Sequence, residues 1–149
     1  MTMKNTIDSL GTLVRLRSTE VERLQADLAK QEATRTRYRT SVERLTDLAV
    51  GSGPSGHSGG ALSPVLAANI GNYKQAVFAL ADTQRIDLHL HEANMAVSQR
   101  NLTQAWTRRE LLDKVLTQHE TAIAREQDRA QRKREDDIAT QSWLAGRAD

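Results

Sequence analysis

The chain has 149 residues, the length of one ordinary domain, but only two Trp, two Tyr and one Phe are available to fill a compact core. Although 27% of the residues are charged, the net charge is only +2, which excludes a general electrostatic affinity for nucleic acid or anionic membranes. The absence of cysteine excludes disulfides and thiolate metal sites and fits a cytoplasmic protein. This composition favours long helices with a narrow apolar face.

The first segment, residues 1–50, carries a heptad pattern. Ten of thirteen positions spaced alternately by three and four residues are apolar, which predicts a coiled-coil helix. Residues 34–41 alternate like a strand, but the heptads continue through them, so we expect helix throughout. The predicted core positions are Ile7, Leu10, Val14, Arg17, Val21, Leu24, Leu28, Gln31, Arg35, Tyr38, Val42, Leu45 and Ala49.

Residues 51–63 interrupt this pattern with a Gly/Ser-rich turn. Five glycines and one proline occur between positions 51 and 60, and each glycine costs a helix about 1 kcal/mol. The turn ends in a helix-start signal, because Ser63 can cap the next helix and Pro64 suits its first position. We therefore expect a flexible connection followed by a new helix.

The second segment, residues 64–149, is longer and has a similar pattern. Two successive steps of four residues, from Leu80 to Gln84 to Leu88, predict a stutter that locally unwinds the coiled coil. The predicted core positions are Leu66, Ile70, Tyr73, Val77, Leu80, Gln84, Leu88, His91, Met95, Ser98, Leu102, Ala105, Arg109, Leu112, Leu116, His119 and Ile123.

Two periodic helices joined by one turn bury most apolar surface by folding back on each other. The sequence thus predicts an all-α fold, a two-helix antiparallel coiled-coil hairpin with a longer second helix. We expect the helices to meet at the turn, where Val50 faces Pro64. Ile7 then lies near Thr107. The second helix exceeds the first by roughly 40 residues, which leaves residues 108–149 as a charged C-terminal overhang.

The overhang alternates basic and acidic side chains between residues 125 and 137. Many lie three or four positions from an opposite charge, which indicates a solvated helix surface, with protein docking as the alternative. The acidic residues oppose a DNA-binding interpretation, because they cancel the basic field. Trp106 is expected to close the core where the first helix ends. Trp143 lies beyond any partner helix, either as a docking anchor or within a frayed tail.

No arrangement of residues indicates catalysis or a bound cofactor. His89 and His91 are two residues apart and lie on different faces of a helix, and no HExxH, GxxxxGK[ST] or GxGxxG motif occurs. No segment has the ~20 consecutive apolar residues that a transmembrane helix needs. We therefore expect a non-enzymatic protein without metal or cofactor that acts through protein contacts.

Short motifs spread over nearly the whole chain resemble the FliJ/YscO family of type III export stalk proteins, and most closely its flagellar FliJ branch. They include an apolar pair and Glu-Val in the first helix, Asn-Tyr-x-Gln near the start of the second, and a charged stretch near the C-terminus. The residues that carry the resemblance are Leu10, Leu13, Glu20, Val21, Asn72, Tyr73, Gln75, Leu80, Trp106, Leu112, Leu116 and 134–139.

This resemblance implies a stalk and chaperone of flagellar type III export at the cytoplasmic face of the inner membrane. The stalk would enter the hexameric export ATPase, promote its assembly, couple it to the membrane export gate and bind export chaperones. Near the turn, the resemblance implies gate contacts at Leu45, Tyr73 and Leu80. We assign residues 108–149, with the start of the first helix, to the ATPase pore. The ATPase-side candidates are Trp106, Arg109, Leu112, Leu116, Arg132, Arg134 and Trp143.

Two other functions fit the same sequence. The equivalent stalk of a virulence injectisome has the same pattern, and the residues do not separate it from the flagellar stalk. A self-assembling structural coiled coil also needs two periodic helices. Light scattering separates this last possibility, because a stalk is expected to be monomeric alone and a structural coiled coil to dimerise.

Overall fold

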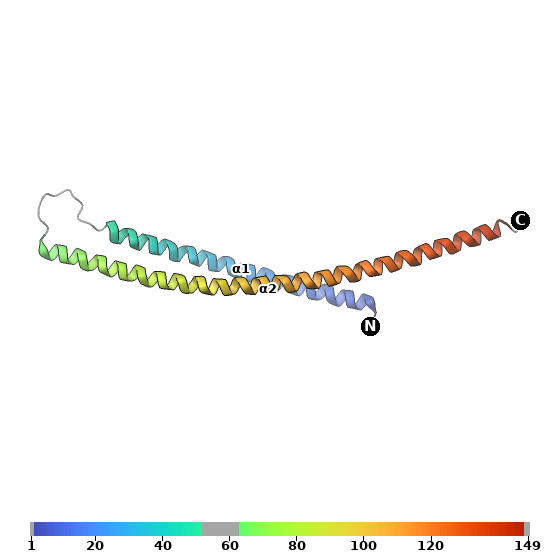
Figure 1. Ribbon diagram of the computed structural model, residues 1–149, viewed down its shortest axis with the longest axis horizontal. Helices are drawn as coiled ribbons and strands as arrows, with labels where there is room; N and C mark the ends of the chain where they lie inside the picture. Colours follow the sequence, from blue (N-terminus) through green and yellow to red (C-terminus); the bar gives the residue numbers. More distant parts are fainter. Residues whose placement is uncertain (1, 52–62, 148–149) are drawn as a thin grey trace. The chain divides into compact units, whose positions relative to one another are not determined.

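The computed structural model describes residues 2–51 and 63–147 and contains two helices (Figure 1). α1 spans Met3–Gly51 and α2 spans Pro64–Ala145. The described residues contain no strand. The helices pack as a hairpin with a longer second helix, which confirms the predicted fold class. Residues 52–62 of the predicted turn lie outside the described residues.

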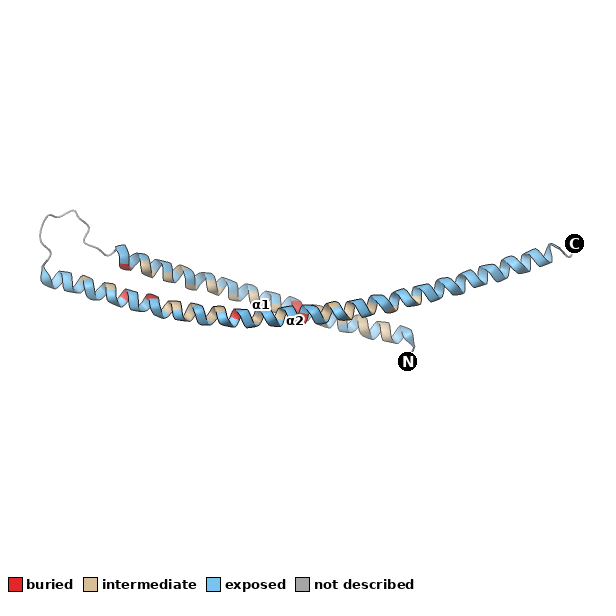
Figure 2. Ribbon diagram, viewed as in Figure 1, coloured by how far each residue is buried: buried red, intermediate tan, exposed pale blue. Residues whose placement is uncertain are grey.

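The chain divides into two compact units. Unit 1 combines Met1–Glu22 with Thr103–Asp149, and unit 2 is Arg23–Leu102. Each unit therefore contains one segment of α1 packed on one segment of α2. Figure 2 shows that the buried residues are few, as expected for a pair of helices that share only one face.

The core positions predicted for α1 are confirmed. All thirteen are buried or partly buried, and Ala49, with 1% of its surface exposed, is the most buried of them. Val21, with 5% of its surface exposed, is the other buried member of this set. A mostly apolar heptad without a break in register was therefore sufficient to identify the face that α1 buries.

The strand-like residues 34–41 are helical, as expected. The Thr34 hydroxyl donates to the carbonyl of Lys30 at 3.2 Å, and the Thr36 hydroxyl donates to that of Glu32 at 3.1 Å. Because these hydroxyl groups bond one turn back within the helix, they are satisfied without competing for another backbone conformation. Tertiary packing of the heptad face then outweighs the low helix propensity of threonine.

α2 has an unbroken heptad core where the sequence predicted a stutter. Ala81 is 0% exposed, whereas Leu80 is 50% exposed, so the stutter at Gln84 is wrong. Closely packed helices accept alanine in the core and leave the larger neighbour at the flank. Tyr73 and Leu66 also lie outside the core, because each is about half exposed. The buried or partly buried heptad positions are Ile70, Lys74, Val77, Ala81, Gln84, Leu88, His91, Met95, Ser98, Leu102, Ala105, Arg109, Leu112, Leu116, His119 and Ile123.

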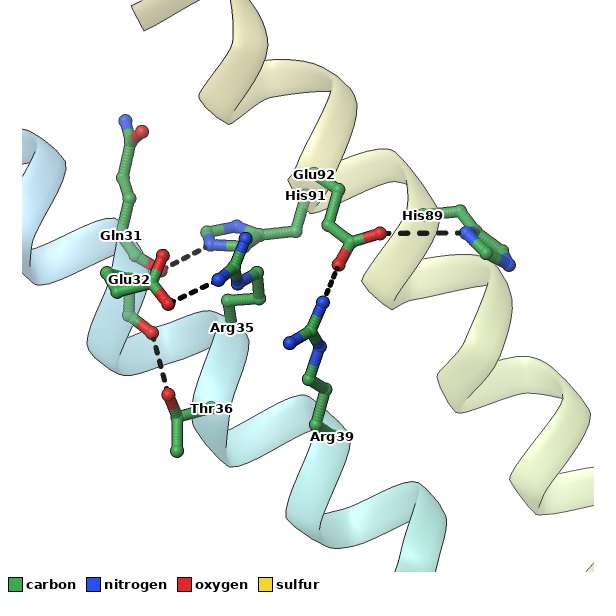
Figure 3. Close-up of polar contacts among 8 residues, drawn as sticks. All are labelled: Gln31, Glu32, Arg35, Thr36, Arg39, His89, His91 and Glu92. Carbon is green, nitrogen blue, oxygen red and sulfur yellow. Dashed lines mark hydrogen bonds and ion pairs between the residues drawn. The ribbon is translucent and has the colours of Figure 1, made fainter. Parts of the chain in front are cut away.

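At the centre of unit 2, polar contacts link α1 to α2 (Figure 3). The Arg39 guanidinium donates to the Glu92 carboxylate at 2.9 Å. Nε2 of His91 lies 2.7 Å from the backbone carbonyl oxygen of Gln31, and it must carry the proton because a carbonyl only accepts. The His91 ring also lies 5.7 Å, between centroids, from the ring of Tyr38. These pairs hold one segment of α1 against one segment of α2.

The centre of unit 2 also contains a polar layer, formed by Gln31 and Arg35, in which two buried atoms lack a hydrogen-bond partner within the part of the chain that the structure describes. In the described residues, Oε1 of Gln31 and Nε of Arg35 are buried without a hydrogen-bond partner. The Arg35 guanidinium does donate to Glu32 at 2.5 Å through its terminal nitrogen (Figure 3). Polar groups in a coiled-coil core reduce stability but restrict which residues can face each other.

The order of the contacts makes the helix pair of unit 2 antiparallel. Arg85 donates to Thr46 at 3.2 Å, one heptad from the Arg39–Glu92 pair along both helices. Residue numbers therefore rise along α1 as they fall along α2. All four residues follow a core position by one, so they lie on one flank of the core, named here the bonded flank.

Unit 1 is paired differently from the prediction. Nε of Arg109 donates to the Ser18 hydroxyl at 3.0 Å, and Ile7 lines a groove together with Leu116. The expectation that Ile7 lies near Thr107 is therefore wrong. Lengthening a connection adds little closure entropy, so contacts between core residues decide the pairing rather than the position of the turn.

α2 consequently has unpaired segments at both of its ends. In unit 2, residues 63–69 are exposed and Ile70 is the first partly buried residue of α2. In unit 1, Ile123 is the last partly buried residue, and residues 124–147 are exposed (Figure 2). The segment of α2 without a partner therefore begins after Ile123, later than the predicted start at residue 108.

Candidate protein-binding surfaces

The three residues predicted on the gate side all lie in unit 2. Tyr73 is 48% exposed and Leu80 is 50% exposed, so both present a large side chain to solvent. Leu45 is partly buried at a core position of α1. Two of the three candidates can thus contact a partner directly, whereas Leu45 belongs to the internal packing of unit 2.

Leu48 is a further candidate that the sequence prediction missed. It is about half exposed and lines a shallow groove at the end of α1. Leu48 and Leu80 each precede a buried core alanine by one position, on the flank opposite the bonded flank. Together with Tyr73, they form an apolar set named here the turn-side surface. The signal in the sequence was a large apolar residue directly before a small core residue.

Trp106 does not close the core of unit 1. Its side chain is 50% exposed, and the neighbouring Ala105 is buried instead. The interpretation of Trp106 as a core residue is therefore wrong, for the same reason that Leu80 yields to Ala81: the small side chain lets the helices approach. An indole that is half exposed is available to a binding partner.

Three other ATPase-side candidates belong to the internal packing of unit 1. Leu112 and Leu116 are partly buried at core positions. Arg109 donates to Ser18 at 3.0 Å and to the carboxylate of Glu110 at 3.2 Å. These side chains hold α2 against α1, so a partner would meet only their exposed edges.

The charged candidates Arg132 and Arg134 lie in the exposed part of α2. Within the described residues 124–147, no ion pair forms, and Gln131 donates to Glu135 at 3.0 Å. The spacing of charges in this segment therefore does not produce the internal pairs that the sequence suggested. The two guanidinium groups face solvent.

Trp143 lies two residues before the end of α2 and is 59% exposed. The guanidinium carbon of Arg147 lies 4.5 Å from the centroid of its ring, within the range of a cation–π contact. The amide of Gly146 donates to the carbonyl of Ser142 at 3.0 Å, so the last turn remains hydrogen-bonded. The tryptophan is thus presented from ordered helix.

Unit 1 also exposes aliphatic residues that sequence reasoning did not select. Leu13, Leu16, Leu111 and Val115 are each two-fifths exposed or more, although they are large and apolar. Each directly precedes a core position, as Leu80 does in unit 2. An apolar residue one position before the core is therefore a recurrent feature of this sequence.

Within the described residues, no group of three or more His, Cys, Asp or Glu side chains could hold a metal ion. No helix in this part of the chain is long and apolar enough to cross a membrane.

Comparison with known families identifies the chain. The family model described as "Flagellar FliJ protein" matches residues 6–148, nearly the whole sequence. The searches of curated proteins and of solved structures gave no match. The family is associated with flagellar export and is not an enzyme family. On this match, together with the hairpin of unequal helices, the chain belongs to the FliJ family of the flagellar type III export apparatus.

Proposed function

We propose that this chain is the stalk of the flagellar export ATPase. Residues 124–145 enter the hexameric ring together with the rest of unit 1, and promote its assembly. The turn-side surface contacts the membrane export gate and couples it to the ring. Export chaperones are further partners, and the chain is held at the cytoplasmic face of the inner membrane through these contacts.

One observation carries this proposal. After Ile123, α2 continues to Ala145 with every described side chain exposed and no segment of α1 beside it. An isolated helix of this composition is marginal in water, so a bound partner would supply its missing contacts. A ring that encloses the segment can meet all its faces, including those of Arg132, Arg134 and Trp143.

The first test removes residues 124–149 and measures the ATPase activity of the cognate hexamer. We expect stimulation to be lost, while the circular dichroism melting curve retains the cooperative transition of the paired helices. Stimulation equal to that of the full chain would contradict the ring assignment. Arg109 and Trp106 variants then show whether the paired part of unit 1 contributes.

The second test addresses the gate contact. Replacing both Tyr73 and Leu80 by serine is expected to weaken binding to the cytoplasmic part of the gate about tenfold, because two half-exposed apolar anchors are lost. ATPase stimulation should remain, since these residues lie in unit 2. Ile86→Ser is the matched control, because Ile86 is exposed but lies outside the turn-side surface. Equal losses for the control and the double variant would contradict the assignment.

A further inference from the structure

A groove on unit 1 has an apolar floor and a charged rim. Ile7, Val14 and Leu116 contribute the apolar side chains, so the groove opens directly onto the helix core. Its volume is about 520 Å³, enough for a large side chain. The remaining lining residues are Asp8, Gly11, Thr12, Arg15 and Glu120.

Gly11 opens this groove, and the fold gives no reason for a glycine there. In the described residues no backbone angle φ is positive, so the chain does not need glycine's conformational freedom at this position. A Cβ atom built on Gly11 meets nothing within 4 Å, so close packing does not require glycine either. A glycine inside a helix costs roughly 1 kcal/mol relative to alanine. The glycine at position 11 is therefore better explained by binding to another molecule than by folding.

Comparison with the bonded flank of unit 2 shows which contact is missing at Gly11. In unit 2, Arg39 pairs with Glu92 on this flank. Four heptads further along each helix, the same pairing places Gly11 opposite Glu120, and both residues line the groove. Glycine offers no side chain to this carboxylate. Within the described part of the chain, Glu120 forms no ion pair.

The rim as a whole has two carboxylates, those of Asp8 and Glu120, and one guanidinium, that of Arg15. Asp8 is a second carboxylate without an ion pair in the described chain. The Arg15 guanidinium is the one cation lining this groove, and it lies 3.5 Å from the Thr12 hydroxyl, to which it donates. An apolar floor beside an unpaired carboxylate matches a side chain with an aliphatic stem and a cationic end, as in arginine and lysine.

We infer that this groove receives an arginine or lysine side chain of the export ATPase. The inference rests on the proposed function, because unit 1 is the part assigned to the ring. The stem of the side chain covers Ile7, Val14 and Leu116, and its cation bonds Glu120. The partner's cation thereby pairs with Glu120, for which Gly11 offers no side chain. The bonded flank of unit 1 is therefore completed only when the partner binds.

The test measures binding of the full chain to the cognate ATPase with two variants that change the groove in different ways. Gly11→Leu fills the groove, and Glu120→Gln keeps its shape but removes the charge. Each is expected to weaken binding about tenfold, as for loss of one charge-assisted contact at an interface. Glu120→Gln should also make binding less sensitive to salt, which a purely steric defect does not do.

Gly71→Leu is the matched control. Gly71 is also a glycine inside a helix whose added Cβ meets nothing within 4 Å, but it lies in unit 2. Both leucine substitutions are expected to raise the melting temperature, because both replace glycine in a helix. Only Gly11→Leu should weaken ATPase binding. A loss of binding without a loss of folding therefore identifies the groove.

The outcomes separate the inference from the proposed function. If the wild-type chain binds the ATPase and both groove variants bind as tightly, the groove is not the contact and the stalk assignment stands. If the wild-type chain does not bind the ATPase, both the stalk assignment and the groove inference are wrong. Thr12→Cys gives a direct check, because the chain has no other cysteine to react with a thiol-linked photo-crosslinker. The crosslinked ATPase peptide should contain arginine or lysine, and a peptide without either would overturn the inference.

Discussion

The two units differ in how they treat the flank beside the core. In unit 2 the bonded flank is closed by Arg39–Glu92 and by Arg85–Thr46. In unit 1 this flank is bonded at Ser18, which accepts from Arg109, but one heptad away Gly11 lies opposite Glu120 and both residues line an open groove. The comparison indicates that unit 2 uses its polar side chains to fix which residues face each other. Unit 1 leaves apolar and charged side chains open along this groove.

The largest effect is expected at the core of unit 2. Ala81→Glu places a charge at a position with no exposed surface, so the free energy of unfolding should fall by about 3 kcal/mol or more. Urea unfolding followed by circular dichroism measures this change. Ala79→Glu is the control, because Ala79 is exposed on the same helix. If both variants lost the same stability, Ala81 would not be a core residue.

The next effect is a gain of stability from the polar layer. Gln31→Leu removes a buried amide oxygen that has no hydrogen-bond partner in the described residues. We expect the free energy of unfolding to rise by about 1.5 kcal/mol, because an unsatisfied polar group is replaced by an apolar one. The backbone carbonyl that faces His91 is retained. Gln25→Leu, at an exposed position, should change stability little.

Gln31→Leu also tests whether the buried amide restricts how the helices pair. If Gln31 restricts which residues face each other, Gln31→Leu should increase stability while allowing alternative pairings. Light scattering would then detect dimers, and a chemical crosslinker would join positions that are distant in unit 2. A variant that is less stable than wild type would show that the Gln31 side chain contributes a favourable contact.

Much of the fold could be predicted from the sequence because one signal dominated. The heptad of α1 is apolar at Val14, Val21 and Leu28 and continues through residues 34–41, so its core face was identified completely. Pro64 opens α2, as its fixed backbone angle φ suggested. Periodicity reports which face of a helix is buried, and here both helices bury such a face.

Two errors about the core share one physical cause. Sequence reasoning selected Leu80 for the core rather than its smaller neighbour Ala81, and it added Trp106 to the core beside Ala105, which it had selected correctly. Close approach of two helices favours the smaller side chain, which hydrophobicity alone does not reveal. The pairing of Ile7 was also misplaced, because periodicity does not specify how far one helix slides along the other.

Surface residues were predicted less well than the core, since no periodicity constrains them. Tyr73 and Leu80 were selected for their resemblance to a family pattern, and their exposure came from the structure. Leu48 was missed because its exposure follows from the burial of its smaller neighbour Ala49. The groove at Gly11 was missed, because it depends on residues from the other helix. A helical glycine with no turn beside it was the available signal.

A smaller effect tests whether Gly11 is needed for the stability of unit 1. Gly11→Ala should raise the free energy of unfolding by between about 0.5 and 1 kcal/mol, because alanine is the better helix former and its Cβ meets open space. Gly71→Ala in unit 2 should give a similar gain. Thermal melts of both variants measure the difference. A loss of stability for Gly11→Ala alone would mean that the glycine has a structural role in unit 1.

The smallest expected effect concerns the ion pair that closes the bonded flank of unit 2. A double-mutant cycle on Arg39→Ala and Glu92→Ala should give a coupling free energy of about 0.5 kcal/mol, since both side chains are partly exposed. The coupling should decrease in high salt. The Arg85–Asp82 pair, within α2, is the control for salt effects that do not cross the helices. A coupling of zero at low salt would mean that apolar contacts alone close this flank, and the contrast with Gly11 and Glu120 would lose its basis.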